Sequence, residues 1–541
     1  MANSTLATSE ENCTKIEAGL PAQDPPCGLA AHKGKNESLS LVNESSLNLS
    51  RKTKIHIVKG RDSNTSPREL WIWGILATAI ISWQLFLPPI IGLADQGDFV
   101  RILGPLGYAP KPKSPEHKYF YITRKFVRDP NYREPRWEQI SSEFVPARIA
   151  VGLNTILFSA QEFDLTMFGF VHTVLFIGAL SRLLWAVKPL ANHRVAWAGL
   201  LLITTDVGYV SYWNSLYTEP ASCIWLVFLA AESVALSTSL LVSAWQIGRW
   251  NMFAVLWITA KTQNAALCIP LAAYGFALVW RGKNVRSRSL AVIGVVGVIA
   301  SGVLMYRSLL PAPRVVGIYN MIFMAVLPEA KDPASDLRSL GLNPQYAKYS
   351  GTLAWSADTG IADGVLVNSI QAKITTFSII KFYLARPGRM WAHIRLVLRT
   401  AFSLRPECCG NFEATAGRPP GAKSYGFAIW SEFHQKVLSR IAIFLLGAVA
   451  GFPLIGSVFL LLGHNHNQPF RRAVEMAMCL SACCLLAFLS AAFGDAWEPV
   501  KHQYLFNLLM DSCILWAAIS AVSAIRAARA AWRFKAQITA R

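Results

Sequence analysis

Charged residues are scarce in this sequence, and their scarcity is the first property that limits its class. Only 16% of its 541 residues are Asp, Glu, Lys or Arg, whereas 53% are hydrophobic. A soluble protein of this length needs much more charged surface. The apolar residues also gather in long blocks. The composition therefore excludes a soluble enzyme and predicts an all-α polytopic membrane protein.

The sequence also lacks the cysteine and histidine patterns of common metal sites. Its 10 cysteines form no CxxC pair and no zinc-type spacing with histidine. The net charge of +20 is typical of the inward loops of a membrane protein rather than of a nucleic-acid-binding surface. We therefore expect no nucleic-acid partner and no certain cofactor, although the neighbouring carboxylates Asp95 and Asp98 could hold a divalent cation.

The amino-terminal part of the chain has no long apolar run before Leu70. Residues 1–69 are instead rich in Ser, Asn, Lys and Glu. Such a composition cannot bury enough apolar surface to fold. We expect a disordered cytoplasmic tail with no signal peptide.

Long apolar blocks predict the membrane segments, because a spanning helix needs about 20 apolar residues. The blocks that approach this length are 70–93, 164–187, 195–211, 217–240, 289–310, 437–462, 472–494 and 503–525. A further stretch, 250–280, is interrupted by "AKTQN". It is either one span with Lys261 inside it or a hairpin with Lys261 at its tip.

Basic residues choose between these two arrangements, because Lys and Arg gather in short loops on the cytoplasmic side. The clusters are Arg182, Lys188 and Arg194; Arg281, Lys283, Arg286 and Arg288; Arg471 and Arg472; and Arg526, Arg529, Arg533 and Lys535. With the amino-terminal tail inside, every cluster falls inside only if 250–280 goes out and returns. The expected fold therefore has about ten membrane segments and both chain ends in the cytoplasm.

This topology implies a division of the chain into successive parts. They are a disordered cytoplasmic tail (1–69), an amino-terminal membrane module (70–310) with an acidic first outer loop (94–163), a large outer segment (311–436), and a carboxy-terminal membrane module with a basic cytoplasmic tail (437–541). Within the outer segment, residues 379–402 mix arginines with aromatic and aliphatic residues. The mixture predicts a basic amphipathic helix, kinked at Pro387, that lies on the membrane lipids.

The outer loop behind the first span opens with "GLADQGDFVR", residues 92–101. Asp95 and Asp98 are followed there by Arg101. A lone aspartate at a helix end usually just solvates the interface. Two of them at the mouth of a membrane cavity could instead supply a general base toward a hydroxyl.

Two further outer turns carry polar residues. "YWNSLYTEP" contains Asn214 and Glu219, and Glu219 could simply favour the positive end of a helix. "KTQN" contains Lys261 and Gln263. A lysine within an apolar stretch is costly and usually functional, so we expect Lys261 to bind an anion at the outer rim.

A last outer connector, "FGDAWEPVKHQ", is dense in ionisable residues. It holds Asp495, Glu498, Lys501 and His502. A Lys-His pair beside acids could bind a phosphate, or the stretch could be an ordinary polar connector.

In their order along the chain, the motifs "DQGDF", "NSLYTE", "KTQN", "LGLNPQYAKYSG" and "GDAWEPVKHQYLFNLLMD" resemble the GT-C superfamily of integral-membrane glycosyltransferases. More narrowly, they look like bacterial glycan-biosynthesis hexosyltransferases of the WsfD type. The resemblance runs from about residue 70 to 525. It implies that a hexose moves, with inversion, from a polyprenyl-phosphate donor to a cell-surface glycan or lipid acceptor. It also implies that the reaction occurs at the outer face of the bacterial cytoplasmic membrane.

The resemblance further implies roles for the outer polar residues. Asp98 is the expected catalytic base, with Asp95 as the second choice. The residues expected to bind the donor phosphate are Lys261, Lys501, His502 and Arg101. The residues expected to contact substrate are Glu219, Asn214, Gln263, Asp495 and Glu498.

A polytopic transporter or lipid flippase is the alternative function. Transporters place ionisable residues near the midplane, on broken helices in repeated halves. We find no convincing internal repeat, and most acids lie at the outer rim, which favours the enzyme. Asp206 and Asp511, inside predicted spans, could be pathway residues or satisfied contacts between helices.

Overall fold

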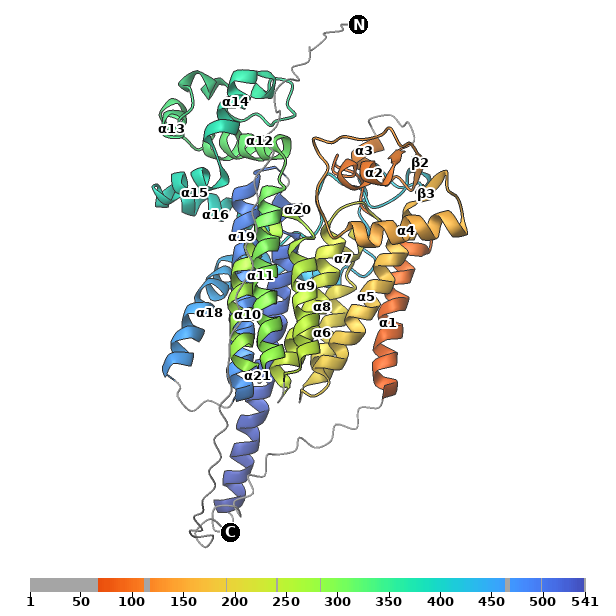
Figure 1. The fold of residues 1–541 in the computed structure, drawn as a ribbon, viewed down its shortest axis with the longest axis vertical. Coiled ribbons are helices and arrows are strands. Elements are labelled where there is room, and N and C mark those ends of the chain that lie inside the picture. Colours follow the sequence, from red (N-terminus) through yellow and green to blue (C-terminus); the bar gives the residue numbers. More distant parts are fainter. Residues whose placement is uncertain are drawn as a thin grey trace, which may run out of the picture. The chain divides into compact units, whose positions relative to one another are not determined.

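The computed structural model describes residues 67–110, 117–190, 192–239, 242–282, 284–462, 468–497 and 499–539, so nearly all of the expected tail lies outside the described residues. Eight helices in the described part are long and apolar enough to cross a membrane, and a bent pair raises the number to nine. The chain is therefore an all-α polytopic membrane protein, as its composition predicts (Figure 1).

The first span, α1 (Pro67–Phe86), ends before the expected boundary at residue 93. Pro88 and Pro89 follow it, and proline has no backbone N–H with which to continue a helix. The chain leaves α1 as an irregular loop, in which the backbone N–H of Ile91 donates to the carbonyl of Gln84 (3.1 Å). This loop leads directly to Asp95 and Asp98.

The expected span at 195–211 is bent rather than straight. It consists of α6 (His193–Thr204) and α7 (Val207–Val210), which together with the turn up to Trp213 bend by 49°. Asp206 stands at the break and caps α7, because its Oδ1 accepts from the backbone N–H of Gly208 (2.7 Å). The preceding span, α5 (Leu165–Val187), begins as expected.

The stretch 250–280 is a hairpin with Lys261 at its tip. Helix α9 (Ala244–Ile258) ends, a 3₁₀ turn η2 (Thr262–Leu267) follows, and α10 (Cys268–Arg281) returns. Both arms pack against α11 (Val285–Arg307), and α9 also packs against α8 (Glu219–Thr238) (Figure 1). A Cβ at Gly302 would lie 2.5 Å from the Cys268 sulfur, so glycine permits this close approach.

The second half of the chain has two short helices where one kinked helix is expected. The stretch 379–402 is divided between α15 (Thr376–Leu384) and α16 (Pro387–Ala401), and Pro387 begins the second helix. This part also contains α12 (Pro311–Asn320), a π-helical turn η3 (Met321–Val326), α13 (Pro333–Ser339), α14 (Gly364–Lys373) and α17 (Ile429–Lys436), which leads into the next span.

The last spans are α18 (Ala442–Leu462), α19 (Gln468–Gly494) and α21 (Tyr504–Thr539). The one-turn helix α20 (Pro499–His502) stands between α19 and α21. Helix α21 continues well past the expected boundary at residue 525, so the expected basic tail is helical as far as the structure describes it.

The first loop contains a small sheet that the sequence patterns do not predict. Strands β1 (Tyr108–Pro110), β2 (Lys125–Arg128) and β3 (Glu162–Asp164) pair antiparallel in that order. Strands this short show no alternation that a pattern could detect. The remaining elements of this loop are α2 (Val100–Leu106), α3 (His117–Phe120) and α4 (Phe144–Leu157).

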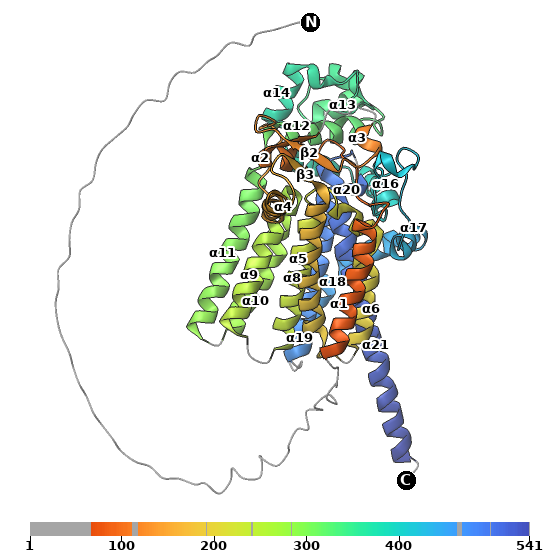
Figure 2. The same cartoon turned by 90° about the vertical axis from the view of Figure 1, so that its right-hand side faces the viewer.

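The loop behind α1, helices α12 to α16, α20 and the tip of the α9–α10 hairpin lie at one end of the spanning helices, which we call the loop-bearing end (Figures 1 and 2). Hydrogen bonds tie these segments together, such as the bond from the Gln263 amide to the His502 carbonyl (2.8 Å). At the opposite end, Arg281 forms an ion pair with Glu475. The loops and the basic clusters therefore lie at different ends, as the charge pattern predicts.

The two acids inside spans are satisfied contacts between helices. The Asp511 carboxylate accepts from the Tyr209 hydroxyl (2.6 Å) and the Trp430 indole (2.8 Å), and it pairs with His434 (2.6 Å). The Asp206 Oδ2 accepts from the backbone N–H of Trp430 (2.8 Å) and of Ser431 (3.0 Å). Both acids hold the start of α17 against the spans, which favours the structural alternative for them.

Candidate functional site

Asp98 is placed by a turn that Asp95 builds. The Asp95 Oδ1 accepts from the backbone N–H groups of Gly97 (2.6 Å) and Phe99 (3.2 Å). Gly97 has a φ of 103°, a conformation that glycine adopts without strain. Asp95 therefore shapes the turn, and the turn presents Asp98 just before α2.

Asp98 lies between two cations. Its Oδ2 is 2.6 Å from the Nζ of Lys501, and its Oδ1 is 2.9 Å from a guanidinium nitrogen of Arg101. Burial alone would raise the pKa of Asp98, but the charges of Arg101 and Lys501 outweigh burial and hold that pKa well below its usual range. The carboxylate is therefore fully ionised and a weak base while both cations remain on it.

Lys501 is almost fully buried, on the one-turn helix α20. Its ammonium lies 5.3 Å from the centre of the Tyr217 ring, a cation–π distance. The Tyr217 hydroxyl donates to the carbonyl of Ala94 (2.8 Å) and accepts from the backbone N–H of Gln96 (2.9 Å). Tyr217 therefore links the lysine to the turn that carries Asp98.

Lys261 is paired with Glu219. The Lys261 Nζ donates to the Glu219 carboxylate at 2.7 Å, and the side chains are 13% and 4% exposed. Glu219 is the first residue of α8, so the pair joins the hairpin tip to the start of that span. The charge of Lys261 also contributes to the low pKa of Asp98, which places the second pair near the first.

His502 brings no positive charge at neutral pH. Burial and the nearby charges of Lys261 and Lys501 lower its pKa well below the ordinary value. Its carbonyl accepts from the Gln263 amide (2.8 Å). The imidazole is therefore neutral, and it can offer one N–H to an anion.

Two of the expected substrate residues form hydrogen bonds that join parts of the fold, and a third lies outside the described residues. Asn214 is buried and donates to the carbonyls of Leu85 (2.9 Å) and Ile91 (2.8 Å), which fixes the loop after α1. Asp495 accepts from the Asn320 amide (3.0 Å) and so connects the end of α19 to α12. Glu498 lies outside the described residues.

A buried pair, Glu143 and His172, which the sequence analysis did not select, positions the start of α8 next to the site. The Glu143 Oε1 is 2.6 Å from the Nε2 of His172, and its Oε2 accepts from the backbone N–H of Ala221 (2.8 Å). Both side chains are fully buried. Glu143 thereby fixes the first turn of α8, which carries Glu219. A histidine within the apolar span 164–187 was the available signal.

No group of three or more His, Cys, Asp or Glu within the described ranges has the geometry of a metal site. Asp98 and Asp95 are the acids expected to hold a divalent cation. Both oxygens of Asp98 already contact cations, and an oxygen of Asp95 accepts two backbone N–H groups. The two carboxylates therefore do not fit a divalent cation in this arrangement.

Comparison with known proteins gives one family. The profile of the YfdI N-terminal transmembrane domain matches residues 52–539. No curated protein matches the chain.

Solved structures with a similar chain path come from an archaeon. One is the oligosaccharyltransferase AglB from Archaeoglobus fulgidus in complex with an inhibitory peptide and a dolichol-phosphate, at 11% identity and a TM-score of 0.33, covering 86% of this chain and 52% of that one. Another is the apo form of the Archaeoglobus fulgidus oligosaccharyltransferase, at 11% identity and a TM-score of 0.35, covering 87% and 53%. The chain thus spans about half the length of these structures. At such TM-scores the likeness does not extend to activity.

Proposed function

The chain belongs to the family of the YfdI N-terminal transmembrane domain, and from the site at its loop-bearing end we propose that it is a membrane glycosyltransferase. It moves a hexose from a polyprenyl-phosphate donor to a glycan or lipid acceptor, as WsfD-type hexosyltransferases are expected to do. The loop-bearing end faces outward from the bacterial cytoplasmic membrane. The observation that carries the proposal is a carboxylate, Asp98, held directly beside the buried ammonium of Lys501 and the guanidinium of Arg101.

This pairing suits a lipid-phosphate leaving group. A donor phosphate can take the place of the Asp98 carboxylate on Lys501 and Arg101, because both anions accept the same charge-assisted hydrogen bonds. Once Lys501 and Arg101 contact the phosphate instead of the Asp98 carboxylate, the pKa of Asp98 rises toward its ordinary range. Binding of the donor therefore converts Asp98 from a weak base into an effective one.

Sugar transfer then forms one bond at the anomeric carbon and breaks another. Asp98 accepts the proton of the acceptor hydroxyl, and the acceptor oxygen forms a bond to the anomeric carbon. The bond from that carbon to the phosphate oxygen breaks with inversion. The polyprenyl phosphate leaves with both bonding electrons, and Lys501 and Arg101 stabilise its charge. Asp98 later releases the proton to water.

The transporter alternative has less support. Of the ionisable residues in the spans, Asp206 and Asp511 were its candidates, and fixed hydrogen bonds from α17 occupy both. A carrier needs such groups free to exchange ligand during a conformational change. The partly solvent-exposed ion pair of Asp98 lies at the loop-bearing end instead.

The experiment that tests the proposal is transfer by purified protein in lipid nanodiscs. Polyprenyl-phosphate hexose with a radioactive sugar serves as donor, and a lipid-linked oligosaccharide serves as acceptor. Asp98→Asn keeps the size of the side chain and removes the base, so we expect a loss of at least ~10²-fold. The matched control is Asp358→Asn, which changes an exposed aspartate at the same end of the molecule. Wild-type protein that transfers no sugar, or equal rates in both variants, would contradict the proposal.

A further inference from the structure

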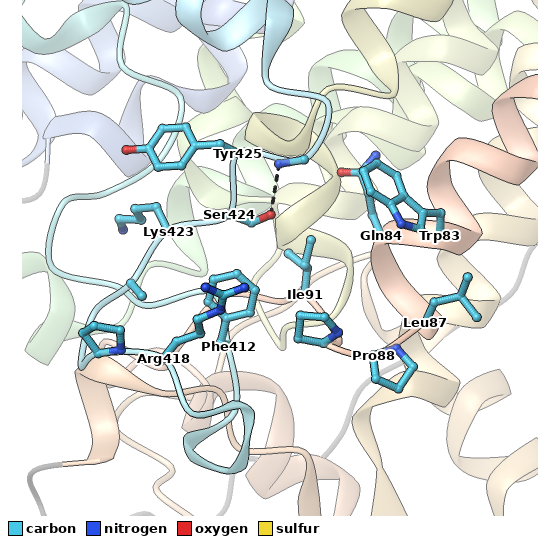
Figure 3. A pocket seen from close by; sticks show the side chains of 14 residues that line it. Trp83, Gln84, Leu87, Pro88, Ile91, Phe412, Arg418, Lys423, Ser424 and Tyr425 are labelled. Atoms are coloured by element: carbon cyan, nitrogen blue, oxygen red, sulfur yellow. Dashed lines mark hydrogen bonds between the residues drawn. The ribbon is translucent and has the colours of Figure 1, made fainter.

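A cavity of about 410 Å³ opens between the end of α1 and residues 412–426 (Figure 3), and neither Asp98 nor its two cations line it. One wall is apolar and includes Trp83, Leu87 and Ile91. The facing wall carries Arg418 and Lys423. The cavity therefore has one apolar wall and one basic wall.

The positive charge of the basic wall is not neutralised by acidic residues of the cavity. None of the residues that line the cavity is a carboxylate. Arg418 is exposed and lies 5.8 Å from the centre of the Phe412 ring, and no carboxylate in the described part of the chain forms an ion pair with it. Lys423 donates to the backbone carbonyls of Pro406 and Cys409, and burial lowers its pKa to about 8. A bound anion could therefore contact the guanidinium of Arg418, which has no ion-pair partner in the described part of the chain, and the ammonium of Lys423, which two backbone carbonyls hold in place.

The apolar wall of the cavity is continuous with an exposed face of α1. Helix α1 is a candidate span that leaves most of its surface uncovered. Trp83 and Leu87, which line the cavity, are 50% and 57% exposed. Trp71 and Ile75, further along the same helix, are exposed too. A hydrocarbon chain can follow α1 from the cavity into the bilayer.

The far side of the cavity borders the site of Asp98. The backbone N–H of Ala94 donates to the carbonyl of Gly410 (3.0 Å), and the Asn411 amide donates to the carbonyl of Gly92 (2.7 Å). The Gln96 amide lies 2.7 Å from the sulfur of Cys408. Residues 408–411 are therefore the partition between the cavity and the turn that holds Asp98.

From this arrangement we propose that the cavity binds the phosphate headgroup of a second lipid, the carrier of the acceptor glycan. Arg418 and Lys423 face the phosphate, and the hydrocarbon chain lies along α1. The donor phosphate occupies Lys501 and Arg101 on the other side of the partition, so the two lipids approach Asp98 from different sides. This assignment of the acceptor rests on the proposed function.

The test uses two acceptors with the same oligosaccharide, one linked to polyprenyl diphosphate and one free of lipid. Arg418→Gln removes a charged contact without leaving a buried group unpaired. Its KM for the lipid-linked acceptor should rise about tenfold or more, because that contact is charge-assisted. The KM for donor and the KM for the lipid-free acceptor should not change. Ala422→Phe, which fills the cavity, should give the same pattern, whereas Arg395→Gln, an exposed arginine outside the cavity, should not.

A binding measurement separates this proposal from the proposed function. Polyprenyl diphosphate alone should raise the thermal stability of wild type more than that of Arg418→Gln, whether or not sugar transfer occurs. Equal stabilisation of the two proteins would overturn the site. The same Arg418-dependent stabilisation by phosphatidylglycerol vesicles would show a general anionic-lipid site and overturn the acceptor assignment. A KM for lipid-linked acceptor that Arg418→Gln leaves unchanged would overturn it as well.

Discussion

The ammonium of Lys501 lies 2.6 Å from the carboxylate of Asp98, although 403 positions separate the two residues in the chain. The contact joins the loop behind the first span to α20, the one-turn helix that precedes the last span, α21. Because Lys501 is buried and Asp98 is partly open to solvent, the pair sits where a ligand can reach the acid and replace it on the lysine.

Replacing Lys501 by Met should affect binding and pH dependence together. Loss of the ammonium removes the proposed ligand of the donor phosphate, so the KM for donor should rise by at least about tenfold. It also removes a charge that depresses the pKa of Asp98. A depressed pKa keeps the base ionised to low pH, so the acid limb of kcat/KM should move to higher pH in the variant.

The matched control for this variant is Lys373→Met, which changes an exposed lysine at the end of α14. Its pH profile and its KM should match those of wild type. An acid limb that stays at the wild-type pH in Lys501→Met would mean that Asp98 is not the titrating base.

Lys261→Met should destabilise the protein, contrary to the simple expectation that an apolar replacement suits an apolar stretch. The variant leaves the Glu219 carboxylate buried with no cation, and breaking a buried pair this way typically costs roughly 3–5 kcal/mol. The double variant Lys261→Met/Glu219→Gln removes both charges and should recover most of that loss. Thermal unfolding in detergent measures both effects, and a single variant as stable as wild type would argue that Glu219 is not the partner that matters.

Glu143→Gln should be tolerated, whereas Glu143→Leu should not. The His172 Nδ1 lies 3.0 Å from the carbonyl of Trp213, so Nδ1 carries a proton there. The Nε2 atom can then accept from a glutamine N–H, while the glutamine oxygen accepts from the N–H of Ala221. Leucine leaves the Nε2 atom of His172 and the backbone N–H of Ala221 without partners, at a cost of about 1–3 kcal/mol each. Melting temperatures of the purified variants compare them, and a glutamine variant as unstable as the leucine variant would show that the pair needs its charge.

The orientation of the protein can be tested by labelling single cysteines in intact cells. We expect a membrane-impermeant reagent to reach Asn343→Cys, at the loop-bearing end, and to miss Asn284→Cys, at the start of α11. The reason is that Arg and Lys concentrate around the second position and stay in the cytoplasm. The reverse labelling would place the site of Asp98 in the cytoplasm.

Apolar blocks and charge asymmetry were enough to predict most spans, since both are properties of local sequence. They also predicted the hairpin around Lys261, because only a hairpin keeps the basic clusters together. They failed at the short strands β1 to β3 and at the bend of α6 and α7. At the bend, Asp206 accepts backbone bonds from α17, which lies more than 200 positions away and cannot be read from local sequence.

Asp98, Lys501, Arg101 and Lys261 could be selected from sequence because charge at the rim of an apolar block is costly and therefore informative. Their pairing could not be predicted, because no local pattern states which acid meets which base. The pairing of Lys261 with Glu219, for example, appears only in the structure. Asn214 was expected to contact substrate because it lies in the same motif as Glu219. Its amide instead donates to backbone carbonyls at the end of α1 and in the loop that follows.

The three side chains that contact Asp511 also set an order of events during synthesis. Asp511 lies in α21, which follows every other candidate span in the chain. Until α21 enters the membrane, the side chains of Trp430 and His434 have no acceptor there, and α17 is held at its start by Asp206. Lys501 is synthesised only ten positions earlier. A nascent chain that has not yet reached Lys501 and Asp511 therefore lacks both the buried cation on Asp98 and the acceptor for His434.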